Sequence, residues 1–457
     1  MKYLLFLTSL LILTACKITP DTQIPEGKVC GLKIHNIEFP LDPDDLKYRD
    51  QVSKRISDGA QNVLYLSGGG QHGAFGAGFL DEWRIINNKI DFKGQVPSQK
   101  AREYSGLPPF DIVTGVSTGA LLSTPAFIGE TEVAVSVATI ETEEEILKAF
   151  VSGDDFGKKI PIEVIYSLMT KGAFSDLEGL RSLLHKTITP EMLNKVAEKS
   201  SYVDEDGKVK ERKLFVGATD FDSGGAVAFD MTDLAQRYSV AKSLQEKNVL
   251  KSCYVESLIA SSSVPGAAKP VFIDNRMFID GGIRFTVFSD DIGKQIRQQF
   301  TARSGPKRVF VVMNSDLETK KLCGKEDPEL CKLEAEDAYL YEGERKAWGF
   351  DGLAGRTIDL LADQVGRFSV RKATELEKSA STVELISIDR IVKDNHPFEY
   401  EGKTKTCDQW RTLDKDTENP IQFHPYYMKC LIDYGRSVAR NEICKLEESG
   451  RSEHCKE

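Results

Sequence analysis

A run of three glycines directly after an apolar stretch constrains the fold of this chain more than any other feature. Residues 62–67 (NVLYLS) are apolar enough for a buried strand, and Gly68, Gly69 and Gly70 follow at once. Consecutive glycines permit positive φ angles and leave their backbone N–H groups unobstructed by side chains. Because a helix-like stretch follows at 74–87, the glycines are predicted to form a tight loop between a strand and a helix.

A second strand-to-helix junction further along the chain carries a serine. The sequence GVSTG at 115–119 lies between an apolar stretch and a helix-like run at 121–128. In a Gly-x-Ser-x-Gly elbow the small neighbours, here Gly115 and Gly119, allow the strained turn that exposes the serine hydroxyl. Ser117 would then lie at a helix N-terminus, where the helix dipole favours negative charge. Ser117 is therefore the predicted nucleophile.

The two junctions supply most of what acyl transfer at a serine requires. Backbone N–H groups of the glycine loop would hold the oxyanion that forms in such a reaction. The predicted oxyanion hole consists of Gly68, Gly69, Gly70 and Gly73. Asp280, which follows an apolar run and precedes two glycines, is the best candidate for the acid–base partner. Burial would have to raise the pKa of this aspartate, and an aspartate before glycine is equally typical of a β-turn.

The first residues have the pattern of an export signal that ends at a cysteine. Lys2 precedes a short apolar stretch at 3–13, whose length suits a signal peptide better than a transmembrane helix. The Leu-Thr-Ala-Cys ending resembles the lipobox of bacterial lipoproteins, which implies cleavage before Cys16 and lipidation of its sulfur. An ordinary cleaved signal is the alternative. Lys17 is not the aspartate associated with inner-membrane retention, so we expect an anchor in the outer membrane of a Gram-negative cell envelope.

Cysteine usage and charge agree with an exported protein that binds no nucleic acid. Of nine cysteines, eight remain after Cys16, and an even number suggests disulfides, with Cys323 and Cys331 as a plausible local pair. The irregular cysteine spacing argues against a metal site. A formal net charge of −10 argues against a nucleic-acid partner. The oligomeric state is not indicated.

A dinucleotide site is the competing interpretation of the glycine loop. Gly68, Gly70 and Gly73 also satisfy Gly-x-Gly-x-x-Gly after a strand, with Asp91 as the ribose-binding acid. This interpretation leaves the serine elbow unexplained, and an exported chain has little access to NAD. We therefore expect no cofactor.

Strand-like and helix-like stretches alternate along the chain, which predicts an α/β fold with a mainly parallel central sheet flanked by helices. Further strands are expected at 214–218, 271–273, 308–313 and 383–388, and a long amphipathic helix at 357–376. The expected organisation is a signal peptide at 1–16, a tether at 17–60, a catalytic domain at 61–390 and a cysteine-containing extension at 391–457.

These elements, in this order, resemble the patatin-like phospholipases from about residue 61 to 316. Besides the glycine loop and the elbow, the resemblance rests on KGAFS at 171–175, ATDFDSG at 218–224, SSSVPG at 261–266 and IDGG at 279–282. Beyond these bounds, residues 428–439 look like a closing helix of the family. The resemblance implies a three-layer patatin-like fold and a Ser117–Asp280 dyad without histidine. The implied activity is hydrolysis of lipid acyl esters, of phospholipase A or lysophospholipase type, with membrane lipid as substrate.

One position departs from the family pattern, and two alternative functions stay open. The family often has arginine or lysine where this chain has His72, which is equally well interpreted as a packing residue. A Ser-His-Asp esterase would instead use Asp280 or Asp290 with one of three histidines. These histidines are His396, His424 and His454. A non-catalytic lipoprotein would use the same fold to bind lipid or an envelope protein.

Overall fold

The computed structural model describes residues 28–36, 62–89, 107, 110–138, 173–175, 177–203, 209–288, 308–315, 317, 322–324, 339–341, 360–371, 382–417 and 423–446. Several sequence predictions fall outside these residues, namely those on Lys2, Cys16, Lys17, Asp91, Asp290, Cys331 and His454.

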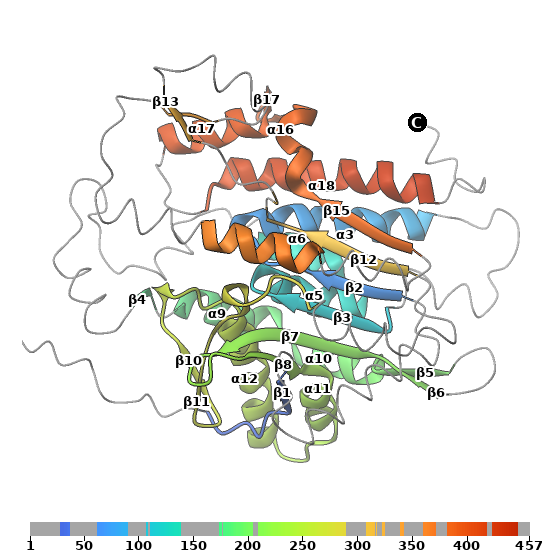
Figure 1. The fold of residues 1–457 in the computed structure, drawn as a ribbon. Helices are drawn as coiled ribbons and strands as arrows, with labels where there is room; N and C mark the ends of the chain where they lie inside the picture. The colour runs from blue at the N-terminus through green and yellow to red at the C-terminus, as the bar shows by residue number, and fades with distance from the viewer. Residues whose placement is uncertain are drawn as a thin grey trace, which may run out of the picture.

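A nine-stranded sheet, mostly parallel at its centre, forms the middle layer of the described part of the chain (Figure 1). Its strands are β1 (Ile34–Asn36), β2 (Asn62–Leu66), β3 (Ile112–Val116), β7 (Lys213–Asp220), β8 (Ala226–Asp230), β10 (Val271–Ile273), β11 (Arg276–Asp280), β12 (Arg308–Met313) and β15 (Thr382–Ser387). Their order is β1-β8-β7-β3-β2-β12-β15, with β11 also paired to β7 and β10 to β11. The strands from β7 to β15 are parallel, whereas β8, β1 and β11 join antiparallel. The predicted α/β class and mainly parallel sheet are confirmed.

Helices cover the sheet, and the described residues also form four short strand pairs outside it. The helices are α3 (Gly73–Lys89), α5 (Thr118–Ile128), α6 (Thr131–Ala138), α9 (Glu178–Thr187), α10 (Pro190–Glu198), α11 (Met231–Val240), α12 (Leu244–Ser261), α16 (Ile391–Asp394), α17 (Cys407–Thr417), α18 (Pro425–Leu446) and one at 360–371, with 3-10 turns η1 (Gly70–His72), η2 (Gly281–Ile283) and η4 (Ile388–Arg390). The strand pairs are β4 (Ala173–Ser175) with β9 (Gly266–Ala268), β5 (Ser201–Val203) with β6 (Val209–Glu211), β13 (Leu322–Gly324) with β14 (Tyr339–Tyr341), and β16 (Pro397–Tyr400) with β17 (Lys403–Thr406).

The central strands are buried on both faces, which explains their nearly continuous apolar sequences. In β2, Leu64 and Leu66 point into the larger core, which α3, α5 and α12 cover. Val63 and Tyr65 point to the opposite face, into a smaller core that includes the segment 285–288. The predicted strands at 62–67, 214–218, 271–273, 308–313 and 383–388 are all observed, with shifts of a few residues at most.

Part of the expected tether belongs to the sheet, which corrects the prediction for that stretch. Residues 34–36 pair with β8, and Cys30 forms a disulfide with Cys253 of α12. The Asp274 carboxylate accepts the N–H groups of Cys30 and of Leu32, each at 2.6 Å. The polar, proline-dotted composition around this stretch concealed it, because an edge strand of three residues has almost no apolar pattern of its own.

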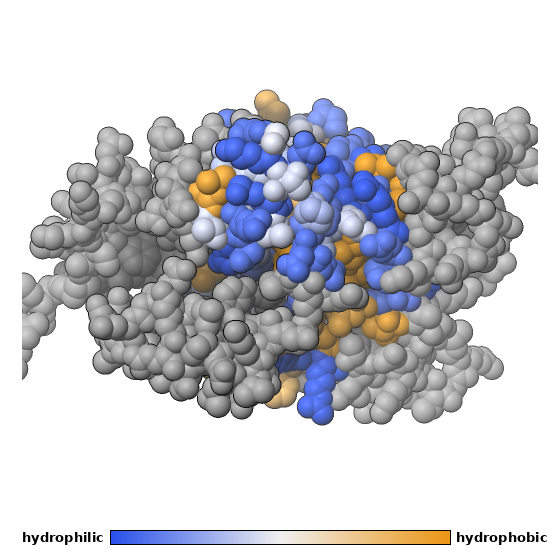
Figure 2. Space-filling view, turned by 90° about the horizontal axis from the view of Figure 1, so that it is seen from above, coloured by the Kyte–Doolittle hydropathy of each residue, from blue (hydrophilic) through white to orange (hydrophobic). Residues whose placement is uncertain are grey.

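The C-terminal extension packs against α3, the helix that follows the glycine loop. Helix α18 lies alongside α3 (Figure 1), and the contact is close because glycines meet backbone there. A Cβ atom at Gly435 would lie 2.2 Å from the Phe75 carbonyl oxygen, and one at Gly78 would lie 2.1 Å from the Ile432 carbonyl oxygen. A disulfide joins Cys407, at the start of α17, to Cys430 of α18. Seen from above, the described surface over this extension is largely hydrophilic (Figure 2).

Candidate active site

Ser117 lies in a strained turn between β3 and α5, as the elbow sequence predicts. Its φ is 55°, a backbone conformation that residues other than glycine rarely adopt. A Cβ atom at Gly115 would lie 2.2 Å from the Gly119 carbonyl oxygen, and one at Gly119 would lie 2.2 Å from the Leu66 carbonyl oxygen. Only glycine fits at both positions, so the two elbow glycines allow β3, α5 and β2 to meet this closely.

The glycine loop lies directly beside the elbow. A Cβ atom at Gly68 would lie 3.0 Å from the Ser117 Cβ and 3.6 Å from its Oγ, so the backbone approaches the serine without a side chain between them. Gly70 has a φ of 57°. The N–H groups of Gly68, Gly69 and Gly70 donate to no acceptor among the residues that the structure describes. They are thus available to an oxygen atom bound beside Ser117.

Gly73 has a different place in the loop. Its N–H group already donates to the carbonyl oxygens of Gly70 and Gln71, which leaves no donor for an oxyanion and corrects that part of the prediction. A Cβ atom here would lie 2.6 Å from the Thr118 Cγ2. Gly73 therefore lets the helix that follows the loop pack against the residue after the serine.

Asp280 reaches the elbow because β11 pairs with β7, the neighbour of β3. Asp280 lies opposite Ala218 in that pairing. The next residue, Gly281, touches the end of β3, since a Cβ atom on it would lie 2.9 Å from the Val116 Cγ1. The order of strands thus brings Asp280 and Ser117 to one edge of the sheet, although the segments are far apart in sequence.

The Asp280 carboxyl group is buried and only partly hydrogen-bonded. The residue is 3% exposed, and its Oδ1 accepts the Gly282 N–H at 2.7 Å. Oδ2 makes no hydrogen bond of ordinary geometry to the described residues, although Ser117 lies near enough to lower the pKa of Asp280. Burial is the dominant influence and raises that pKa from 3.8 to about 6, against the smaller effects of Ser117 and Gly282. The result is a stronger base than an exposed aspartate.

Two buried residues to which the sequence analysis gave no role, Ser261 and Asn314, support these parts. The Ser261 hydroxyl accepts the Ser117 N–H at 2.9 Å and donates to the Gly217 carbonyl at 2.5 Å. Asn314 donates from Nδ2 to the Ser67 carbonyl and from its backbone N–H to the Ser67 hydroxyl, each at 2.8 Å. Asn314 directly follows a predicted parallel strand, so the shared edge of such strands was a usable signal for it.

The described histidines do not complete a catalytic triad. The His396 Nε2 lies 2.8 Å from the Asp433 carboxylate, and the His424 Nδ1 lies 3.1 Å from the Gln71 Oε1. No hydrogen bond joins a described histidine to Ser117 or Asp280. The His72 ring packs edge-on against the Tyr427 ring, with the ring centroids 5.9 Å apart. The geometry among these residues is that of a serine–aspartate pair.

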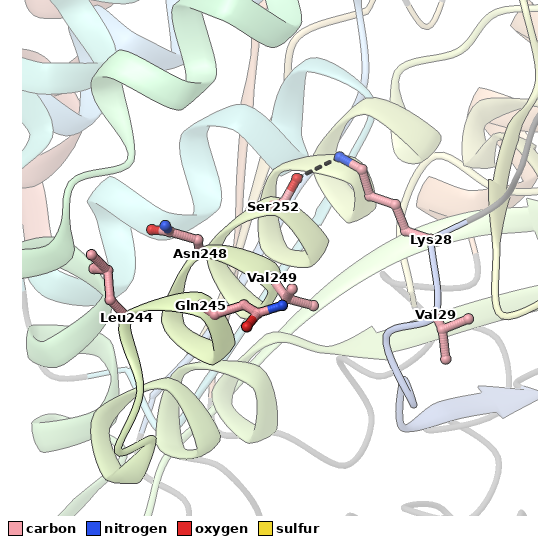
Figure 3. Close-up of a pocket in the computed structure, with 7 residues that line it drawn as sticks. All are labelled: Lys28, Val29, Leu244, Gln245, Asn248, Val249 and Ser252. Atoms are coloured by element: carbon pink, nitrogen blue, oxygen red, sulfur yellow. Dashed lines mark hydrogen bonds between the residues drawn. The ribbon is translucent and has the colours of Figure 1, made fainter.

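A groove of about 690 Å³ lies at the other end of α12 from Ser261. Its lining, shown in Figure 3, consists of Lys28, Val29, Leu244, Gln245, Asn248, Val249 and Ser252. Lys28 extends across it to hydrogen-bond Ser252. None of the predicted site residues lines this groove, so it is separate from the candidate active site.

The described residues include neither a metal-binding cluster nor a membrane-spanning helix. They contain no group of three or more His, Cys, Asp or Glu side chains placed to hold a metal ion. No helix in the described part of the chain is both long enough and apolar enough to cross a bilayer.

Comparison with known proteins agrees with this geometry. Residues 64–288 match the sequence profile of the patatin-like phospholipases, a family of lipid acyl hydrolases. The chain therefore contains a patatin-like phospholipase domain, which includes the glycine loop, the elbow and Asp280. Among solved structures it is similar to VipD from Legionella pneumophila, at 11% identity and a TM-score of 0.23 over 70% of this chain and 67% of VipD. No curated protein matches the chain in sequence.

Proposed function

We propose that this protein hydrolyses acyl esters of lipids through a Ser117–Asp280 dyad. The observation that carries the proposal is the convergence of three parts at one sheet edge. A strained serine at a helix N-terminus, a buried aspartate and a row of available glycine N–H groups lie together there. Each part would have a role in acyl transfer, and the match to the patatin-like family supports lipid esters as the substrate class.

The dyad would act in two steps. In the first, the Ser117 Oγ attacks the ester carbonyl carbon while the Asp280 carboxylate takes the hydroxyl proton. The N–H groups of Gly68, Gly69 and Gly70 hold the negative oxygen. The intermediate then collapses, the alcohol leaves with the proton from Asp280, and an acyl-serine remains. In the second step water attacks the acyl-serine and Asp280 takes a proton from the water. The bond between the acyl carbon and the Ser117 Oγ then breaks, Asp280 returns the proton to that oxygen, and the fatty acid is released.

The substrate and location that we propose follow from the N-terminal sequence together with the domain. A lipidated Cys16 would hold the enzyme at a bilayer, in the outer part of a Gram-negative envelope. Membrane phospholipid or lysophospholipid would then be the nearest ester. The disulfide between Cys30 and Cys253 supports an oxidising compartment.

Acyl release from phospholipid vesicles tests the proposal. Protein lacking residues 1–16 is incubated with mixed phospholipid and lysophospholipid vesicles, beside Ser117→Ala and Asp280→Asn. We expect fatty acid release by the parent and a loss of at least about 10³-fold in both variants. A fluorophosphonate probe should label the parent and not Ser117→Ala. A folded parent that is neither labelled nor active would instead indicate a lipid-binding lipoprotein.

A further inference from the structure

A histidine of the C-terminal extension, His424, hydrogen-bonds the 3-10 turn that follows the glycine loop. The buried Gln71 side chain belongs to η1, which continues from Gly69 and Gly70. Its Oε1 accepts two hydrogen bonds from His424, one from the backbone N–H and one from the ring Nδ1, each at 3.1 Å. His424 is 3% exposed. One residue of the C-terminal extension thus makes two hydrogen bonds to a single oxygen atom of η1.

The two hydrogen bonds together fix the orientation of the Gln71 amide and the position of the proton on the His424 ring. A backbone N–H can only donate, so the atom of Gln71 that it reaches must be the carbonyl oxygen. The ring Nδ1 approaches the same oxygen, and it must therefore carry a proton and donate as well. His424 consequently acts as a pair of donors at fixed positions.

His424 directly precedes α18, and hydrogen bonds fix the start of that helix. The His424 carbonyl oxygen accepts the Met428 N–H at 2.8 Å. The buried Asp414 of α17 accepts the N–H groups of Tyr426 and Tyr427, at 3.1 and 2.9 Å. The Cys407–Cys430 disulfide links the same two helices. The contact on Gln71 therefore comes from a rigid element.

We propose that His424 is a positioning residue for the oxyanion loop, and that the C-terminal extension is by this contact a part of the active site. The family match ends at residue 288, so the contribution comes from outside the residues that match the family. An oxyanion hole depends on donors placed 2.7–3.1 Å from the developing charge. A small rotation of η1 would move the N–H groups of Gly69 and Gly70 out of that range. The catalytic meaning of this contact rests on the function proposed above.

The test compares two histidines of the same extension. His424→Ala removes the ring bond to Gln71, and His424→Asn keeps an N–H donor near the position of Nδ1. His396→Ala is the matched control, because it removes a comparable bond, to Asp433, that does not involve the loop. We expect His424→Ala to lower kcat about tenfold per probe-labelled serine with KM unchanged, and His424→Asn to stay within about threefold of the parent. His396→Ala should retain the parental kcat.

Amide hydrogen exchange in peptides that cover residues 68–73 gives a readout that needs no activity. His424→Ala should speed this exchange, whereas His396→Ala and His424→Asn should not. Equal kcat and equal loop exchange in His424→Ala and His396→Ala would overturn the proposal, as would an Asn variant as impaired as the Ala variant. If loop exchange responds to His424→Ala alone while the parent releases no fatty acid, the positioning contact stands and the proposed function fails.

Discussion

The carboxyl group of Asp280 is enclosed by protein, and this burial raises its pKa to about 6. A general base works only in its ionised form, so activity should depend on pH through this group. We expect kcat/KM for a soluble ester to rise about tenfold per pH unit below pH 6 and to level off above it. A rate profile from pH 4.5 to 8.5 measures this. A profile that is flat down to pH 4.5 would show that Asp280 is not the base.

The same pKa can be measured without turnover, through stability. The folded pKa of Asp280 lies above its ordinary value of 3.8, so the folded state binds this proton more tightly. That stabilisation is complete below about pH 4 and is lost as the pH rises through about 6. Asp280→Asn keeps the neutral form at every pH. It should therefore unfold like the parent near pH 4 and be more stable at pH 8, by at most about 3 kcal/mol.

At the scale of elements, local patterns were enough to predict the strands and the turns that carry Ser117 and Asp280. An apolar run followed by glycines identifies β2 and its loop, and the elbow sequence identifies Ser117. The supporting contacts could not be predicted in this way. The Gln71–His424 bond joins residues 353 apart, and the Ser67–Asn314 bonds join residues 247 apart. Such pairs depend on how helices and strands pack, which no local pattern records.

The crossing of α3 and α18 yields a prediction about helix packing. Replacing a helical glycine by alanine normally stabilises a helix, by about 1 kcal/mol. At Gly435 the new Cβ would lie 2.2 Å from the Phe75 carbonyl oxygen, so the two helices would have to separate. We expect Gly435→Ala to lower the free energy of unfolding by about 1–3 kcal/mol, measured by guanidinium-induced unfolding.

Gly366, in the helix at 360–371, is the matched control for that substitution. The nearest atom to a Cβ there would be the Ser315 Oγ at 3.9 Å, an ordinary contact. Gly366→Ala should therefore leave stability unchanged or raise it by up to about 1 kcal/mol. If both variants gain stability, the close crossing of α3 and α18 is not as the structure has it.

At the scale of the whole molecule, the Cys30–Cys253 disulfide fixes which part of the fold an N-terminal anchor would hold near a membrane. The link between Cys30 and Cys253 fastens the first described residues to α12, the helix whose last residue, Ser261, bonds the Ser117 N–H. Residues 17–27 separate Cys16 from Lys28. Fully extended, they would reach at most roughly 40 Å. An anchor at Cys16 would therefore keep Lys28 within that distance of a bilayer. The candidate active site would lie farther away by at most the length of α12.

This arrangement predicts that the anchor governs location and access to lipid, and not the chemistry itself. Expressed in a Gram-negative host with labelled palmitate, the parent should incorporate the label and sediment with the membranes, whereas Cys16→Ser should remain unlabelled and soluble. Turnover of a soluble ester per probe-labelled serine should be equal in the two proteins, because neither Ser117 nor Asp280 involves the anchor. Hydrolysis of membrane lipid should fall in the variant, since the substrate is no longer held close by. Label incorporation or membrane retention by Cys16→Ser would mean that the protein reaches its membrane by another route.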